Sequence, residues 1–299
     1  MTEISDEYLS KIEVELLAGG SGSRFNNHLK PKTFKIPKVL VPIDGLPILY
    51  RVINTCKEVG LYDINLILTK SSSEDIINYI ESIGNNLGVW IFDNKRSISY
   101  ELLTIANETK SDSKLKGYGA SNSDKEYMLV LDADNLYTID FLREVIEKSE
   151  EEFKYEDVGV VYFESKMNPA PSVWKFKPEN KIQERFKNHA KNGYFVAATV
   201  FRKEYLKMLG LEDIIKYDIL GKQYYGSVLH LIEIVSSIPL EIMTVDGKVK
   251  KTKVKARFYK LKGEIGHLDY PTHVERLERI IKTSAEEKKD TTLDEYITI

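Results

Sequence analysis

The sequence predicts an α/β protein with a mostly parallel mixed sheet and helices on both faces. The first observation is an alternation of apolar runs and amphipathic stretches through the N-terminal half. The second is that the first apolar run leads directly into glycines, as a strand does before a tight turn. The third is a change in the pattern of apolar residues in the second half, where short β-like runs favour an antiparallel elaboration of the same sheet.

Four strands and four helices are expected to alternate in the first half. The strands are runs of β-branched and leucine residues at Ile12–Ala18, Asp63–Thr69, Gly88–Phe92 and Tyr127–Leu131. The helices are expected at Pro47–Val59, Ser71–Ile83, Ser97–Asn107 and Thr138–Lys148. A Ser-x-x-Glu capping box, Ser71 to Glu74, is expected to open the second of these helices.

The second half is expected to hold short strands and one last helix. The strands are predicted at residues 158–163, 172–177, 181–187 and 194–201, and the helix at Pro271–Ile281. A polar, Gly/Ser-rich stretch at 109–125 is expected to be a mobile loop. No linker divides the chain, so residues 1–284 are expected to form one domain, followed by a charged tail at 285–299.

Composition excludes several classes of protein. The 299 residues are 42% hydrophobic and 30% charged, with a formal charge of −3, so a globally basic nucleic-acid binder is not expected. Cys56 is the only cysteine, which excludes a disulfide framework and a Cys-rich zinc site. No apolar run is long enough to span a bilayer, and the N-terminus is polar. A cytoplasmic protein is therefore expected, and a homo-oligomer is left open.

A glycine-rich loop after the first strand predicts a phosphate site. Glycines let the backbone approach a ligand, and successive amide N–H groups can cradle an anion. The spacing matches neither the dinucleotide fingerprint nor the P-loop. Arg24 follows the loop and offers a guanidinium suited to phosphate oxygens. A tight turn with no ligand is the alternative interpretation.

Two segments resemble the signature of the sugar-phosphate nucleotidyltransferases: Leu17–Arg24, and Pro37–Leu49 with its Pro-Lys-Val-Leu-Val-Pro sequence. The resemblance implies a GT-A-like, Rossmann-like three-layer sandwich. It also implies Mg²⁺-dependent transfer from a nucleoside triphosphate to a sugar 1-phosphate, with release of pyrophosphate. Arg24 and Lys38 would be catalytic. The nucleotide would be bound by Ala18, Gly19, Gly20, Ser21, Gly22, Ser23 and Arg24. Lys32, in an earlier Pro-Lys pair, is left as an additional phosphate contact.

Aspartates are the expected metal ligands. Asp132 and Asp134 follow the fourth strand, at the edge of an α/β sheet where ligands bind. The resemblance assigns Asp134 to the metal, with Asp132 as a further candidate, and it assigns Asp269 in the closing motif as the second ligand. A turn aspartate and an acid at a helix N-terminus are the alternatives. His267 is expected to pack, and a zinc site with His273 is not favoured.

The acceptor side departs from the family. The resemblance implies that Lys187 contacts the sugar phosphate, that Glu184 replaces a missing glutamate, and that a strand opening at Gly193 lets the sugar ring approach. These departures leave the identity of the sugar undetermined. The segment around Ser97 also departs from the family, and it leaves the identity of the nucleobase undetermined. Residues 248–262 hold eight basic and no acidic residues, which favours a half-exposed hairpin over a polyanion-binding surface.

Other functions remain open from the sequence. One is a cytidylyltransferase of a non-sugar phosphate, such as a polyol or choline phosphate. Another is a glycosyltransferase, which shares an Asp-x-Asp but has no need of the glycine loop. The last is a non-catalytic nucleotide-sugar-binding homologue.

Overall fold

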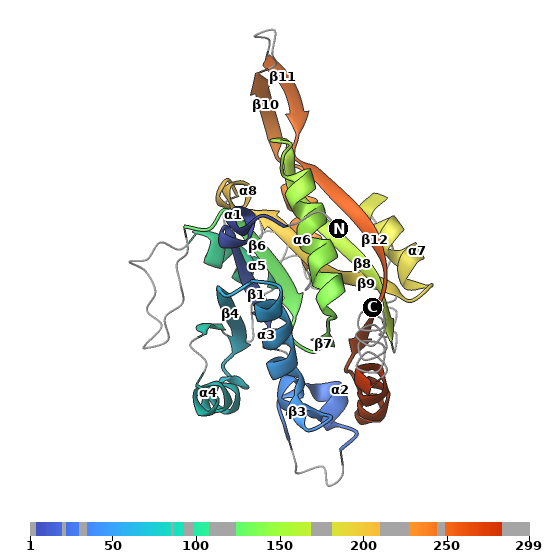
Figure 1. Cartoon of the computed structure of the whole chain (residues 1–299). Coiled ribbons are helices and arrows are strands. Elements are labelled where there is room, and N and C mark those ends of the chain that lie inside the picture. The colour runs from blue at the N-terminus through green and yellow to red at the C-terminus, as the bar shows by residue number, and fades with distance from the viewer. Residues whose placement is uncertain are drawn as a thin grey trace, which may run out of the picture.

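The computed structural model describes residues 4–19, 22–29, 35–84, 87–92, 98–107, 124–168, 181–209, 228–243 and 249–282. Its centre is an eight-stranded mixed sheet with the strand order β5-β4-β1-β6-β9-β8-β12-β7 (Figure 1). Helices cover both faces of this sheet. The predicted three-layer α/β architecture is therefore confirmed.

The four strands predicted in the N-terminal half form the parallel side of the sheet. They are β5 (Gly88–Phe92), β4 (Ile64–Thr69), β1 (Ile12–Leu17) and β6 (Tyr127–Asp132). β1 lies between β4 and β6 and is parallel to both. Because these strands are buried on both faces, their sequences are mainly apolar, although β1 also buries Glu13 and Glu15.

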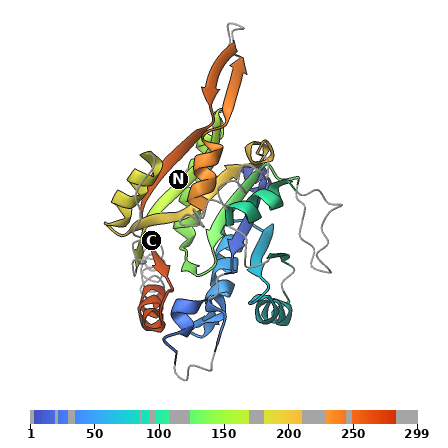
Figure 2. The same ribbon diagram turned by 180° about the vertical axis from the view of Figure 1, so that it is seen from behind.

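Each face of the sheet has its own hydrophobic core. One core receives the helices α3 (Ile48–Glu58), α4 (Ser73–Ser82) and α6 (Ile139–Glu152). The other receives α5 (Ile98–Asn107), α8 (Lys203–Lys207) and α10 (Val228–Val235), on the face seen in Figure 2. β1 contributes to both, because neighbouring side chains on a strand point to opposite faces. Val14 and Leu16 enter the first core, whereas Leu17 packs against the second.

The second half adds the antiparallel elaboration that the sequence predicts. β9 (Tyr194–Arg202) is antiparallel to both β6 and β8 (Val158–Asn168). β12 (Lys255–His267) then runs parallel to β8, and its end pairs with the two-residue strand β7 (Asn135–Leu136). This last pairing brings the segment after β6 beside the C-terminal motif of the chain.

Residues 181–187 form the first part of a helix, α7 (Lys181–Ala190), and the predicted strand there is wrong. The sequence explains the helix, because Ile182, Phe186 and Ala190 recur at the four-residue helical spacing among good helix formers. The strand expected at 172–177, the tail at 285–299, and residues 109–123 of the mobile loop expected at 109–125 lie outside the described residues.

The expected capping box does not start α4. The helix begins at Ser73, its N-cap is Ser72, and no side chain caps it. The Ser71 hydroxyl instead lies 3.3 Å from the Thr69 hydroxyl at the end of β4. The last predicted helix is present as a 3-10 turn, η3 (Pro271–His273), that continues as an α-helix over 274–282.

Only the first part of the basic segment lies in a hairpin, because the part from Lys255 belongs to β12 of the central sheet. β10 (Pro239–Met243) and β11 (Val249–Lys253) pair antiparallel and project away from the rest of the chain in Figure 1. The lysines are partly paired with acids, since Lys251 lies 3.4 Å from Glu241. Along the described residues, no helix is both long and apolar enough to cross a membrane.

The remaining short elements connect these layers. They are α1 (Asp6–Ser10), α2 (Ser23–Asn26), η1 (Lys38–Leu40), β2 (Pro42–Ile43) and β3 (Leu46–Pro47). η1 and the β2–β3 hairpin contain the Pro-Lys-Val-Leu-Val-Pro sequence and connect the glycine loop to α3. A left-handed residue, Asp44 with φ 51°, and Gly45 with φ 77° form the turn of that hairpin.

Candidate functional site

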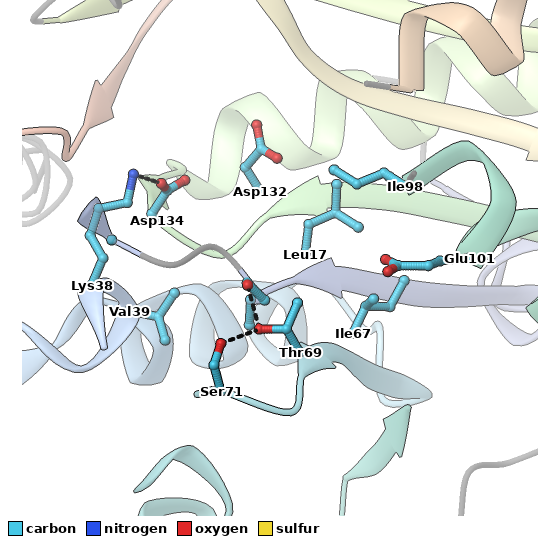
Figure 3. Close-up of a pocket in the computed structure, with 13 residues that line it drawn as sticks. Leu17, Lys38, Val39, Ile67, Thr69, Ser71, Ile98, Glu101, Asp132 and Asp134 are labelled. Carbon is cyan, nitrogen blue, oxygen red and sulfur yellow. Dashed lines mark hydrogen bonds and ion pairs between the residues drawn. The ribbon is translucent and has the colours of Figure 1, made fainter. Parts of the chain in front are cut away.

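A cavity of about 420 Å³ lies at the carboxyl ends of β1, β4 and β6. This volume is in the range of a small-molecule site, and this edge is where α/β sheets bind ligands. Its walls come from the glycine loop, η1, the end of β4, α5 and the aspartates after β6. The lining residues are Leu17, Ala18, Gly19, Gly22, Lys38, Val39, Ile67, Thr69, Ser71, Ile98, Glu101, Asp132 and Asp134 (Figure 3).

The glycine loop forms one wall, and its start is closely packed. The Thr69 hydroxyl donates to the Gly19 carbonyl at 2.8 Å. A Cβ at Gly19 would lie 2.9 Å from both the backbone nitrogen and the Cγ2 of Thr69, so only glycine fits without movement of β4. Gly22 has φ +58°, the left-handed region that glycine adopts without strain. Gly19 and Gly22 both line the cavity, as the predicted anion-binding loop requires.

The other predicted members of this loop are only partly described. Gly20 and Ser21 lie outside the described residues, as does Lys32. Ser23 and Arg24 begin the short helix α2, but their side chains are not described. The nucleotide-binding role of the loop and the catalytic role of Arg24 therefore stay predictions.

One asparagine joins the two ends of the segment between the glycine loop and Lys38. The Asn26 amide nitrogen donates to the Ile36 carbonyl at 3.2 Å, and the Ile36 N–H donates to the Asn26 amide oxygen at 3.1 Å. We call this pair of hydrogen bonds the Asn26 clamp. It holds η1 next to the loop, and a Cβ at Gly22 would lie 3.4 Å from that of Lys38.

Lys38 lies between two aspartates that are far apart in sequence. Its ammonium contacts Asp134 Oδ2 and lies 3.2 Å from Asp269 Oδ1. Burial lowers the pKa of this ammonium, but the two carboxylates outweigh burial and leave the pKa above its usual value. Asp134, Asp269 and Lys38 thus form one charged cluster at the end of the cavity.

Asp132 is the third predicted carboxylate, and it also lines the cavity. Burial and the negative charge of Asp134 raise its pKa to about 7. Figure 3 places its side chain between the Lys38–Asp134 pair and the apolar end of the cavity. Its neighbourhood therefore differs from that of Asp134, which is held by Lys38.

Asp269 is held by two histidines. The Asp269 N–H donates to His273 Nδ1 at 3.1 Å, and His267 Nε2 lies 3.3 Å from Asp269 Oδ2. The other nitrogen of the same ring, His267 Nδ1, is 2.7 Å from Asn135 Oδ1. His267 is buried, as the expected packing role requires, but it also connects Asp269 to the segment after β6. In the sequence, the only indication that these histidines contact Asp269 is the short spacing of His267, Asp269 and His273.

The arrangement fits a divalent cation. Two carboxylates from distant segments converge on one positive charge, that of Lys38, and such oxygens are the protein ligands that Mg²⁺ takes. Among the described residues no cluster of three or more His, Cys, Asp or Glu side chains is arranged to hold a metal. A cation here would therefore complete its coordination with water and substrate oxygens, which is usual for Mg²⁺.

Sequence reasoning missed the residues at the opposite end of the cavity. Glu101 on α5 lines it together with Ile67 and Ile98, and the Glu101 side chain is only 5% exposed. Burial raises the pKa of this carboxyl to about 7. In the sequence, a glutamate in an amphipathic helix is expected at the surface, so no pattern indicated this position.

The predicted acceptor residues lie elsewhere. Glu184 and Lys187 are on α7, where Glu184 is exposed and Lys187 is partly buried. Gly193 is in the turn before β9, with φ +79°. None of the three lines the cavity, so their contact with an acceptor stays a prediction.

Comparisons with known proteins agree with this geometry. The sequence model of the family described as Nucleotidyl transferase matches residues 15–187, which include the glycine loop, Lys38 and Asp134. A low-salt glycan biosynthesis nucleotidyltransferase, Agl11 from Haloferax volcanii, is 40% identical over 76 residues. That match spans 25% of this chain and 20% of the Haloferax protein.

Solved structures share the fold at low identity. A protein named as a glucose-1-phosphate thymidylyltransferase, from Bacillus anthracis in complex with sucrose, has a TM-score of 0.52 and 16% identity, with 90% of this chain and 94% of that chain covered. The inositol-1-phosphate CTP transferase from T. maritima has a TM-score of 0.51 and 14% identity, with coverages of 90% and 96%. HddC from Yersinia pseudotuberculosis, complexed with GMP-PN, has a TM-score of 0.50 and 16% identity, with coverages of 90% and 99%.

The family match covers more than half of the chain, and its residues build both the glycine-loop wall and the Lys38–Asp134 pair of the cavity. The fold is shared with solved nucleotidyltransferases along nine-tenths of the chain. The chain therefore belongs to the Nucleotidyl transferase family.

Proposed function

We propose that the protein transfers a nucleotidyl group from a nucleoside triphosphate to a sugar 1-phosphate. A phosphate oxygen of the acceptor attacks the α-phosphorus of the triphosphate and forms a new P–O bond. The bond between the α-phosphorus and the bridging oxygen breaks, and pyrophosphate leaves with the electron pair. Because the attacking oxygen is already an anion, no general base is needed.

The residues of the cavity have separate roles in this reaction. The amides of the loop that begins at Gly19 bind the triphosphate, and Arg24 adds a guanidinium to the same phosphates. Lys38 neutralises charge that develops during transfer. Asp134 and Asp269 hold Mg²⁺, with Asp132 as a further candidate ligand. Mg²⁺ supplies charge neutralisation at the reacting phosphates when it is bound.

The observation that carries the proposal is the convergence of Asp134, Asp269 and Lys38 beside the glycine loop. These residues come from three segments that are distant in sequence, yet one ammonium contacts both carboxylates. A cation-binding pair of carboxylates next to an anion-binding loop supports chemistry on a metal–phosphate substrate. A turn aspartate and an ordinary helix-terminal acid would not need to meet in this way.

The test is a screen for pyrophosphate release. Purified protein is incubated with five nucleoside triphosphates and a panel of sugar 1-phosphates, with Mg²⁺ and separately with excess EDTA. We expect release with one triphosphate–sugar pair, its loss with EDTA and its recovery when Mg²⁺ is restored. Release of a nucleoside diphosphate instead would indicate a glycosyltransferase, and no release with any pair would contradict the proposal.

A second candidate is transfer to a phosphate that is not on a sugar, as in a polyol phosphate. The observation that favours it is the placement of Glu184 and Lys187 on a helix that does not line the cavity. Including polyol phosphates and choline phosphate in the same acceptor panel separates the two. The same assay tests whether the predicted acceptor residues contact the acceptor. It compares the KM for the acceptor between the native protein and the alanine variants of Glu184, Lys187 and Gly193.

A further inference from the structure

The cavity has two ends of different chemistry. Figure 3 shows the Lys38–Asp134 pair at one end and Leu17, Ile98 and Glu101 at the other, with Asp132 between them. A nucleoside triphosphate is divided in the same way, into a charged tail and a flat, largely apolar base. If the glycine loop and Lys38 bind the tail, the end at Glu101 receives the base. This step rests on the function proposed above.

The base end is apolar except for one carboxyl group. Leu17, Ile67 and Ile98 supply aliphatic surface, against which the face of a base can pack. The Glu101 carboxyl is turned toward Leu17 and Ile67 in Figure 3. Within the described residues no group hydrogen-bonds to it or pairs with it, although only 5% of the residue's surface is exposed. The carboxyl lines the cavity, so a ligand bound there can supply the hydrogen bonds that the described residues do not.

The chemistry of a carboxylate selects among the bases. A carboxylate only accepts hydrogen bonds, and its two oxygens match two adjacent N–H donors. Guanine presents such a pair on its Watson–Crick edge, at N1–H and N2–H. Adenine and cytosine offer one amino donor beside an acceptor nitrogen, which would repel the second oxygen. Uracil and thymine offer one N–H between two carbonyl oxygens, so both neighbours repel.

We propose that Glu101 reads the nucleobase and makes the protein selective for guanosine triphosphate. The two carboxylate oxygens accept from N1–H and N2–H of guanine, while Leu17, Ile67 and Ile98 pack on its faces. Glu101 is then a specificity-determining residue that takes no part in phosphoryl transfer. The carboxyl, which faces the cavity, obtains its hydrogen bonds from the substrate.

The experiment compares nucleotide binding by the full chain and by Glu101→Gln. Titration calorimetry with Mg²⁺ measures Kd for the guanosine, inosine, adenosine, cytidine and uridine triphosphates. Inosine keeps N1–H but lacks the 2-amino group, so it removes one of the two hydrogen bonds. Glu144→Gln, which removes an exposed carboxylate on α6, is the matched control. Thermal unfolding of each variant confirms that it is folded.

We expect the native chain to bind guanosine triphosphate most tightly, with inosine triphosphate at least about tenfold weaker, since one hydrogen bond to a charged group is lost. In Glu101→Gln, guanosine triphosphate should weaken by at least about tenfold, and its advantage over inosine triphosphate should shrink to within about threefold. Uridine triphosphate should change by less than about threefold in this variant. Glu144→Gln should leave every Kd unchanged.

Two results would overturn the inference: tightest binding of a pyrimidine or adenosine triphosphate by the native chain, or an undiminished guanosine–inosine ratio in Glu101→Gln. The inference and the proposed function can fail separately. Guanosine-selective binding that depends on Glu101, without pyrophosphate release for any acceptor, would refute the proposed reaction alone. Pyrophosphate release with another triphosphate, unaffected by Glu101→Gln, would refute the base assignment alone.

Discussion

Replacing Glu101 by glutamine should make the ligand-free protein more stable at alkaline pH. Burial raises the pKa of this carboxyl from an ordinary 4.5 to about 7 in the folded chain. One pKa unit corresponds to about 1.4 kcal/mol, so the ionised side chain destabilises the fold by at most about 3 kcal/mol. The carboxyl lies on the wall of a water-accessible cavity, which reduces the expected penalty to about 1–3 kcal/mol.

The sign follows from the two pKa values. Below pH 4.5 the carboxyl is neutral in both the folded and the unfolded chain, so the glutamate carries no ionisation penalty. As the pH rises from 4.5 to about 7, the unfolded chain ionises first, and stability is lost over that interval. Above pH 7 the loss is complete. Glu101→Gln removes this dependence because the amide does not titrate.

Thermal unfolding and urea titration at pH 5 and pH 8 measure the effect. For a chain of this length, about 2 °C in Tm corresponds to 1 kcal/mol, so Glu101→Gln should gain about 2–6 °C at pH 8. At pH 5 the two proteins should differ by clearly less. Comparing the two pH values cancels any constant difference in packing between the acid and the amide. An equal Tm difference at both pH values, or a loss at pH 8 only, would refute the reasoning.

Three other substitutions test the site and the sheet. Asp134→Ala should lower the kcat for pyrophosphate release by at least about 100-fold, since a metal ligand contributes several kcal/mol to the transition state; full activity would contradict its assignment. Gly19→Ala should destabilise the fold by about 1–3 kcal/mol in urea titrations, because the new Cβ would lie 2.9 Å from the Thr69 backbone nitrogen. Lys203→Met should destabilise by about 3–5 kcal/mol, because it leaves the buried Glu13 carboxylate, 2.8 Å from the lysine ammonium, without that cation; an unchanged urea midpoint would argue against this ion pair.

The parallel half of the sheet could be predicted because its signals are local. Each strand there is a short, mainly apolar run, each helix has an apolar stripe, and the two alternate along the chain. α7 could not be predicted in the same way. The strand at 181–187 is expected from the short β-like runs of the second half, although the spacing of Ile182, Phe186 and Ala190 is helical.

The charged end of the site could be anticipated from sequence, but its opposite end could not. The Val-Leu-Val-Pro sequence that follows Lys38 distinguishes it from Lys32, and the structure places Lys38 against Asp134 and Asp269. Glu101 carries no such signal, because its importance depends on which face of α5 meets the cavity. That face is decided by packing between α5 and the sheet, which no local pattern contains.

The Asn26 clamp has a consequence for how this protein can diverge. Because a single amide, on the last residue of α2, holds Ile36, the distance between the glycine loop and Lys38 does not depend on how many residues lie between them. Length variation at that place is expected to be neutral for the chemistry. The segment between Asn26 and Ile36 is therefore a natural position at which to graft a tag or reporter.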